Sequence, residues 1–291
     1  MKPSAFEYYA PTTRAEALSL LVAHGDAAKV LAGGQSLVPS MNFRLAQPGI
    51  LVDLNGVADL FGLTDAADGG LRIAAMTRQR TVERSPLIAA RVPLLAEALP
   101  HVAHPQIRNR GTVGGSLAHN DPAAELPALM VALRAQFCAQ SVTGERWIAA
   151  ADFFQGIFTT ALEPHELLTE ILIPAPPPRT GMAFAEVARR HGDYAMAGAV
   201  AVVTLAEDGT VTTARLMYLA IGDGPVPAPR AAGALQGAAP TAEAIAAAVA
   251  AVDSDLDPPT DIHATAAYRR HLTRVLARQT LTLAVARAQA G

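Results

Sequence analysis

Two glycine-rich segments of the chain carry the residue types that a phosphate-binding site needs. The first runs through Ala32-Gly-Gly-Gln-Ser36, and the second through Gly111-Thr-Val-Gly-Gly-Ser116. Glycine lets the backbone approach a ligand closely, and successive amide N–H groups in such turns form an anion-binding concavity. The hydroxyls of Ser36, Thr112 and Ser116 would add hydrogen-bond donors to phosphate oxygens. A pair of such segments would suit the two phosphates of a dinucleotide.

Neither segment is a standard nucleotide-binding motif. The second lacks the Gly-x-Gly-x-x-Gly spacing of a Rossmann fold, and neither contains the Gly-Lys-Ser/Thr step of a P-loop. Each segment taken alone is equally consistent with a tight turn. Lys29 directly precedes the first segment and is one of only two lysines in the chain. Its ammonium would either meet a phosphate or remain a solvated charge.

The histidines offer a metal-binding alternative, which the sequence does not favour. His101 and His104 stand three residues apart, but Pro105 disturbs a helix there and no further ligand cluster lies nearby. We therefore expect no metal site in this chain.

Composition excludes several classes of protein. The 291 residues are 51% hydrophobic and 17% charged, so wholesale disorder is excluded. The net charge of -3 argues against a general nucleic-acid binder, which needs a basic excess. The single cysteine, Cys138, cannot build an iron–sulfur cluster and fits a reducing cytoplasm. The start lacks the apolar core of a signal peptide, and the longest apolar run, 195–206, is too short to span a membrane.

The elements that must position the glycine segments are short. The pattern predicts strands over residues 29–31, 50–53, 71–75 and 167–173. It predicts a helix over 87–99 that is interrupted at Pro93, and a helix over 121–133 that starts at Asp121-Pro122.

A proline run divides the chain. Pro176 to Pro178 can continue neither a strand nor a helix, so we expect a connector between domains 1–175 and 179–291. Beyond it, the pattern predicts an antiparallel sheet with strands over residues 184–187, 200–205 and 211–221 and a hairpin turn at 207–210. A Pro-rich crossing segment over 225–240 and two helices over 241–252 and 265–288 follow.

The two glycine segments, in this order and at this spacing, resemble a known family. Ala32-Gly-Gly-Gln-Ser-Leu followed by Gln106-Ile-Arg-Asn-Arg-Gly-Thr-Val-Gly-Gly-Ser-Leu-Ala is similar to the FAD-binding medium subunit of molybdenum hydroxylases. That family includes the flavoprotein subunit of aerobic carbon monoxide dehydrogenase and, more distantly, the FAD domain of xanthine dehydrogenase. Further matching stretches make the resemblance cover nearly the whole chain: 6–11, 53–55, 73–77, 152–156, 166–168, 190–195 and 267–270.

The resemblance implies an α+β fold and a noncovalent FAD. The N-terminal part would be a PCMH-type, vanillyl-alcohol-oxidase-like FAD-binding domain of two α/β subdomains, and the C-terminal part a small antiparallel sheet with helices. It assigns contacts with the cofactor, chiefly its pyrophosphate, to Ala32, Gly33, Gly34, Gln35, Ser36, Leu37, Gly111, Thr112, Val113, Gly114, Gly115 and Ser116.

Four further residues are candidates for the same cofactor. Lys29 would meet a phosphate or an adenine-side group, and His119 would approach the flavin or a phosphate. Glu125 stands where the family places an acidic residue near the ribityl or ribose hydroxyls; it is equally well explained as a first-turn helix carboxylate. Tyr194 aligns with a tyrosine near the flavin ring, and ordinary sheet packing explains it as well.

Three positions depart from the family pattern. Ser116 replaces an Asn, Asn120 stands where Ala is common, and Glu186 lies where many members carry a Lys near the flavin. The last change puts in question a positive charge that would stabilise reduced flavin.

The resemblance also implies the function and the partners. A large molybdopterin subunit would oxidise the substrate and a small [2Fe-2S] subunit would deliver electrons to the FAD of this chain, which passes them to an external acceptor. A dimer of such heterotrimers is the expected assembly, and this chain needs no catalytic acid–base residue of its own. The alternatives are a stand-alone flavin oxidase of the vanillyl-alcohol-oxidase superfamily and a redox-silent, FAD-stabilised scaffold. The substrate and the electron acceptor stay open.

Overall fold

A three-stranded parallel sheet begins the fold in the computed structural model, which describes residues 1–291. Its strand order is β1 (Glu7–Tyr9), β3 (Ile50–Asp53), β2 (Ala28–Leu31). Parallel neighbours need crossover connections, which α1 (Arg14–His24) and α2 (Leu37–Asn42) supply. The Thr13 side chain accepts a hydrogen bond from Glu16 N and so caps α1, which buries its apolar face against β3.

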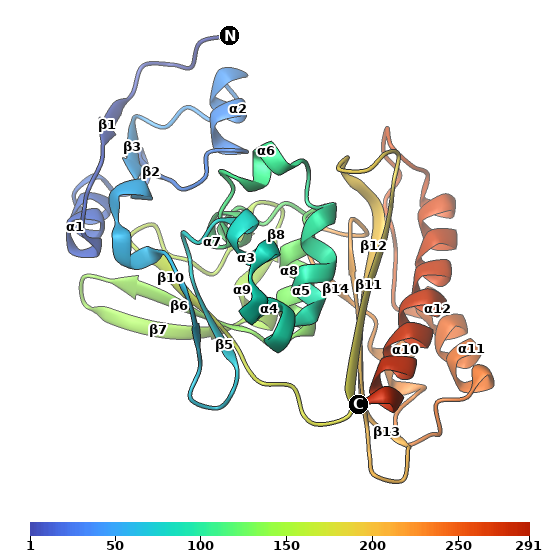
Figure 1. Ribbon diagram of the computed structural model, residues 1–291. Coiled ribbons are helices and arrows are strands. Elements are labelled where there is room, and N and C mark those ends of the chain that lie inside the picture. Colours follow the sequence, from blue (N-terminus) through green and yellow to red (C-terminus); the bar gives the residue numbers. More distant parts are fainter.

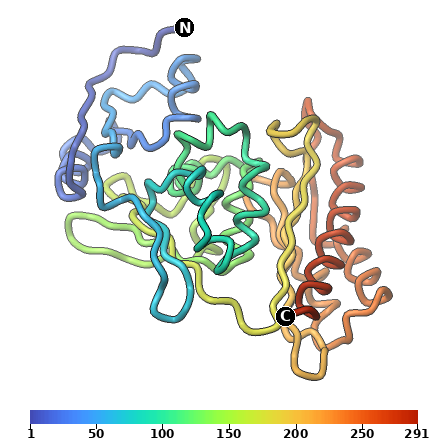
Figure 2. Tube along the Cα trace, in the orientation of Figure 1, coloured from blue at the N-terminus to red at the C-terminus, as the bar shows by residue number.

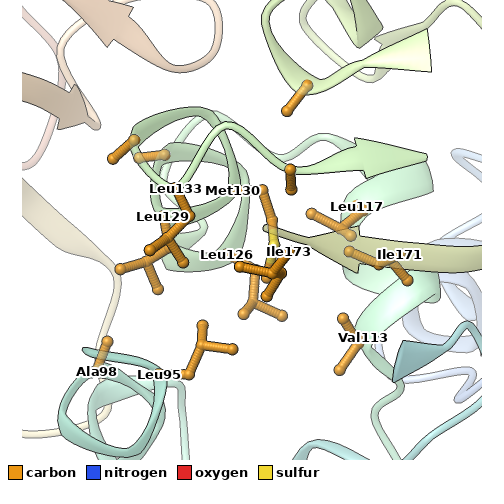
Figure 3. Close-up of a cluster of buried hydrophobic side chains, with 14 of the residues drawn as sticks. Leu95, Ala98, Val113, Leu117, Leu126, Leu129, Met130, Leu133, Ile171 and Ile173 are labelled. Atoms are coloured by element: carbon orange, nitrogen blue, oxygen red, sulfur yellow. The ribbon is translucent and has the colours of Figure 1, made fainter. Parts of the chain in front are cut away.

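A five-stranded antiparallel sheet follows, in the order β4 (Leu63–Asp65), β5 (Leu71–Ala74), β10 (Leu167–Ile173), β6 (Gln136–Ser141), β7 (Gly144–Ala149). The helices between β5 and β10 are α3 (Gln79–Arg84), α4 (Pro86–Arg91), α5 (Pro93–Ala98), α6 (Pro105–Arg108), α7 (Val113–His119), α8 (Glu125–Ala132) and α9 (Ala150–Phe153). A small hairpin, β8 (Phe154–Gly156) and β9 (Thr159–Thr160), lies beside them. Figure 3 shows side chains of α5, α7, α8 and β10 meeting in one buried cluster, so the last strand closes the core around α7.

The chain then crosses once to its C-terminal part, through residues 174–179, which form neither strand nor helix (Figure 2). That part is a four-stranded antiparallel sheet of β11 (Thr180–Ala188), β12 (Ala195–Leu205), β13 (Val211–Leu219) and β14 (Val226–Pro227). It also holds α10 (Pro229–Gly233), α11 (Ala242–Ala251) and the long α12 (Ala266–Ala290). In Figure 1, α12 covers one face of the sheet, and α5 and α8 face the other. All 11 residues of β12 are buried as a result.

The structure confirms the α+β fold class and most of the predicted elements. β3 and β10 begin and end where the pattern predicted, and the helical stretch is interrupted between Arg91 and Pro93. One expectation was wrong: α8 begins at Glu125 rather than at Asp121-Pro122. The Asp121 carboxylate accepts a hydrogen bond from Ala123 N at 2.9 Å, and this local turn delays the helix.

Other boundaries differ because tertiary packing overrides the local pattern. β11 and β12 are longer than predicted, since small residues along them let α12 pack closely on the sheet. The Pro-rich crossing segment contains α10 and the short β14. No helix combines the length and the apolar content needed to span a membrane.

Gly181 marks the closest approach of β11 to α12 and gives a test of this packing. A Cβ built there would lie 1.9 Å from Ala284 O and 2.4 Å from Ala288 N. We expect Gly181→Ala to lower the free energy of unfolding by about 1–3 kcal/mol or more, measured by urea titration. Gly233→Ala in α10 is the matched control, because a Cβ there meets nothing within 4 Å. Equal unfolding midpoints for the two variants would contradict the packing described.

Candidate functional site at the junction of the glycine segments

The first glycine segment (residues 32–37) and the second (residues 111–116) touch each other backbone to backbone. A Cβ on Gly33 would lie 2.5 Å from Arg110 O and 2.7 Å from Gly111 Cα. A Cβ on Gly115 would lie 3.1 Å from the Ala32 Cβ. The structure therefore brings the two separately predicted segments into one site.

Two other glycines serve the shape of the segments. Gly34 has φ of +72°, a conformation that L side chains rarely adopt, at the turn between β2 and α2. Gly114 packs on β5, where an added Cβ would lie 2.5 Å from the Ala75 Cβ. The tight-turn explanation therefore fits Gly34, whereas Gly114 lies in a helix and is needed for close packing; neither role says what the segments bind.

The first segment presents a run of unpaired backbone donors. The N–H groups of residues 33–37 donate to no acceptor in the protein, and the bonds of α2 begin with Val38 N donating to Gly34 O at 3.1 Å. Backbone donors need partners from water or from a ligand. The Ser36 hydroxyl makes no capping bond, so it is also free to bind a ligand.

Thr112 has a second role that the sequence prediction missed. Its buried Oγ1 accepts a hydrogen bond from Gly115 N at 3.0 Å and caps α7, so residues 113–119 form a helix rather than a loop. Val113 N donates to Thr77 O and Gly114 N to Ala75 O, which fix the start of α7 against the end of β5. The Val113 side chain is fully buried in the core, so Val113 can offer only its backbone to the site.

A polar clamp, made of Asn55 and Arg78, links the backbones of the two segments. Asn55 Nδ2 donates to Ala32 O at 3.0 Å. Arg78 donates to Asn55 Oδ1 at 2.5 Å through one nitrogen and to Arg110 O at 2.6 Å through another. Asn55 N in turn donates to the Asp53 carboxylate at the end of β3. Sequence reasoning noted the Asp53-Leu-Asn55 stretch only as a family match, and nothing in the pattern singled out Arg78.

Lys29 and His119 lie within electrostatic range of each other. Lys29 is exposed on β2, before the first segment, and His119 is the last residue of α7. Burial lowers the pKa of His119, and the charge of Lys29 lowers it further, against the opposing effect of Asp121. The His119 ring lies 4.8 Å from the ring of Phe158. The segments therefore carry one nearby positive charge and one mostly neutral imidazole.

Glu125 and Tyr194 come from different parts of the chain and approach the same region. Glu125 begins α8, is 7% exposed, and its carboxyl accepts no hydrogen bond from another residue. Burial, followed by the charge of Glu186, raises the pKa of Glu125 to about 8. Tyr194 lies between β11 and β12 and is 64% exposed. Its phenol lies within electrostatic range of the carboxyl groups of Asp121 and Glu125. Desolvation and these two charges raise the pKa of Tyr194.

Two departures from the family pattern have structural consequences. Asn120 adopts the left-handed conformation (φ +47°) at the end of α7 and donates through Nδ2 to Gly156 O and Thr159 O, so it ties α7 to the β8–β9 hairpin. Glu186 on β11 pairs with His101, at 3.2 Å between Oε1 and Nδ1. His101 thus serves an ion pair, and no group of three or more His, Cys, Asp or Glu side chains is placed to hold a metal ion.

This arrangement suits an anionic, hydroxyl-bearing ligand. The unpaired N–H groups, the free hydroxyls of Ser36 and Ser116 and the Lys29 ammonium all favour phosphate oxygens. Glu125, protonated at neutral pH, would donate a hydrogen bond as well as accept one.

Comparisons with known proteins match this fold over nearly its full length. Residues 4–176 match the family described as FAD binding domain in molybdopterin dehydrogenase, and residues 182–284 match the CO dehydrogenase flavoprotein C-terminal domain. The chain is 43% identical to the 6-hydroxypseudooxynicotine dehydrogenase complex subunit alpha of Paenarthrobacter nicotinovorans, covering 99% of this chain and 97% of that one. It is also 39% identical to the carbon monoxide dehydrogenase medium chain of Afipia carboxidovorans, and this match covers 99% of this chain and 100% of that one. A solved carbon monoxide dehydrogenase from Hydrogenophaga pseudoflava superimposes with a TM-score of 0.95 at 39% identity, covering 99% of each chain.

The polar clamp can be tested by Arg78→Met, which keeps the side-chain length and removes both donated bonds. Because Asn55 Oδ1 and Arg110 O lose their donor, we expect the free energy of unfolding to fall by about 1–3 kcal/mol. Amide hydrogen exchange at Gly111, Val113 and Gly114, whose N–H groups are hydrogen-bonded beside the clamp, should accelerate. Arg91→Met is the control, since the Arg91–Asp65 pair is exposed on both sides and contributes little. If both variants exchange alike, the clamp does not hold the segments.

Proposed function

This chain belongs to the family of FAD-binding domains in molybdopterin dehydrogenases, and on that premise we propose that it is the FAD-carrying electron-transfer subunit of a heterotrimeric molybdenum hydroxylase. It accepts electrons from [2Fe-2S] clusters of a small partner and passes them to an external acceptor. A large molybdopterin subunit oxidises the substrate, and two heterotrimers associate in the complete enzyme.

The observation that carries the proposal is the run of unpaired N–H groups in residues 33–37, held against the second segment by glycine contacts. A pyrophosphate fits this donor set, because each amide lacks an acceptor and Lys29 adds a positive charge nearby. The residues that we propose for FAD are the ones that the resemblance assigned: Lys29, residues 32–37, residues 111–116, His119, Glu125 and Tyr194. We propose that residues 1–175 form the FAD-binding domain and residues 179–291 the C-terminal domain.

Each group has a role that its surroundings support. The amides of the first segment and the hydroxyls of Ser36 and Ser116 bind the phosphates. The neutral carboxyl of Glu125 binds a sugar or ribityl hydroxyl. The exposed ring of Tyr194 covers an apolar ring system from the C-terminal side. When bound, the flavin supplies stepwise electron transfer, and the protein supplies binding, orientation and electrostatics.

The similar chains support a subunit rather than a stand-alone oxidase or a redox-silent scaffold. The relatives are named as a complex subunit and as a medium chain, and this chain covers 97% and 100% of their lengths. The match thus extends over nearly the full length of both relatives. The relatives are named for different substrates, so we assign substrate choice to the large partner. We also propose a cytoplasmic location, which suits a chain with a single cysteine.

Gly33→Ala tests the site by its effect on FAD content. The added methyl would collide with Arg110 O and separate the two segments, so we expect about a tenfold or greater loss of FAD affinity. Gly49→Ala is the matched control, because Gly49 directly precedes β3 and the nearest atom to its Cβ is 3.9 Å away. Fluorescence of FAD released from each purified variant gives the measurement. Full FAD content in Gly33→Ala would overturn the proposed site.

A further inference from the structure

A chain of hydrogen bonds leads from the edge strand β1 to the first glycine segment, and it begins with Tyr8 and Asp53, which lie outside both segments. The Tyr8 hydroxyl donates to Asp53 Oδ2 at 2.5 Å. Tyr8 lies on β1 and Asp53 ends β3, which pairs with β1 on one side and with β2 on the other (Figure 1). The bonds therefore cross the parallel sheet toward β2, the strand that the first segment follows.

The Asp53 carboxylate is buried, and both of its oxygens accept hydrogen bonds. The residue is 9% exposed. Its Oδ2 accepts the Tyr8 bond, and its Oδ1 accepts bonds from Asn55 N at 2.9 Å and from Asn55 Nδ2 at 2.5 Å. A buried carboxylate is costly unless donors of this kind compensate its charge. Among these donors, Tyr8 is the one that comes from another strand.

The same bonds fix which way the side-chain amide of Asn55 faces. Its Nδ2 donates to Asp53 Oδ1 and to Ala32 O, the latter at 3.0 Å. Its Oδ1 accepts a bond from Arg78 at 2.5 Å. An amide turned the other way would set its oxygen against a carboxylate and a carbonyl, and its NH2 group against a guanidinium, so no hydrogen bond could form. Asp53 and Arg78 thus hold the Asn55 donor toward Ala32.

The bond from Asn55 to Ala32 O aims the first backbone donor of the segment. The carbonyl of Ala32 and the N–H of Gly33 belong to one planar trans peptide unit, so they point in opposite directions. Because Asn55 holds Ala32 O, the Gly33 N–H points away from Asn55, and it donates to no acceptor in the protein. Gln35 Nε2 donates to Gly33 O at 3.0 Å and orients the next peptide unit in the same way.

We propose that Tyr8 and Asp53 are positioning residues of the FAD site: acting through Asn55, they hold the peptide unit between Ala32 and Gly33 so that the Gly33 N–H faces the diphosphate of the cofactor. The inference rests on the proposed function. Neither side chain touches the ligand, and their effect reaches it through the hydrogen bonds described. Tyr8 is 55% exposed, so its hydroxyl rather than its ring carries this role.

The test is the affinity for FAD of the purified full chain after removal of its cofactor, measured by quenching of flavin fluorescence. Tyr8→Phe keeps the ring and removes the hydroxyl, so the Asp53 carboxylate loses a donor and holds Asn55 less firmly. We expect the dissociation constant of FAD to rise about three- to tenfold. Asp53→Asn leaves one acceptor oxygen for the donors of both Tyr8 and Asn55, so we expect a rise at least as large.

Tyr9→Phe is the matched control on the same strand. The Tyr9 hydroxyl donates to Glu7 Oε2 at 2.9 Å and makes no bond to Asp53. The substitution removes the same chemical group from β1 without touching the chain of bonds to Ala32. We therefore expect the dissociation constant of FAD to stay within about twofold of the wild-type value.

Two further readouts separate positioning from a general loosening of the sheet. The ³¹P resonances of the bound diphosphate respond to hydrogen bonds from the segment, so they should move in Tyr8→Phe and stay in place in Tyr9→Phe. A double-mutant cycle with Asn55→Ala gives the second readout. If Tyr8 acts through Asn55, adding Tyr8→Phe to the Asn55→Ala variant should change FAD affinity by no more than about twofold.

The outcomes separate the inference from the proposed function. Failure of the wild-type chain to bind FAD would overturn both. Equal FAD affinity in the wild type, Tyr8→Phe and Asp53→Asn would overturn the inference alone, and so would additive effects of Tyr8→Phe and Asn55→Ala. Weaker binding and shifted ³¹P resonances in Tyr8→Phe but not in Tyr9→Phe, together with a non-additive cycle, would support it.

Discussion

The contact between Gly33 and the Arg110-Gly111 backbone is the constraint on which the site depends. It joins the end of β2, in the parallel sheet, to the start of α7, beside the antiparallel sheet. Any side chain at Gly33 would separate these parts, because its Cβ would lie inside the van der Waals radius of a carbonyl oxygen. The contact also has a chemical result. The two segments contact each other by van der Waals packing and form no backbone hydrogen bond with each other. The N–H groups of residues 33–37 therefore stay available for a ligand.

The rest of the fold holds this contact in place. Arg78 and Asn55 tie the carbonyls of both segments together, and the Thr112 cap fixes the first turn of α7. β10, which returns from far along the sequence, lies between β5 and β6 and closes the core around α7 (Figure 3). The C-terminal sheet then packs against α8, and Tyr194 and Glu186 lie within electrostatic range of Glu125, which begins that helix.

The sequence predicted the features that depend on local chemistry. Strands bounded by turn residues, the break at Pro93 and the connector at Pro176–Pro178 can be read from neighbouring residues alone, and both glycine segments were found in the same way. What it missed depends on contacts between distant residues. The Asp121 turn that delays α8, the clamp through Arg78 and the Glu186–His101 pair involve side chains whose partners only the tertiary fold supplies. An arginine or glutamate in isolation gives no sign of its partner, so these roles could not be read from the pattern. The resemblance carried the prediction from a dinucleotide-binding protein to a specific family.

The most direct measurement of the central claim is an absorption spectrum of the purified chain before and after acid precipitation, with the released cofactor identified. The account predicts a flavin spectrum and FAD in the supernatant in an amount equimolar with the chain. Flavin that stays in the pellet would contradict noncovalent binding and point to a covalent flavin oxidase. A colourless chain that also fails to take up added FAD would contradict the claim that this chain binds FAD. The two glycine segments would then be turns that pack on each other and bind nothing.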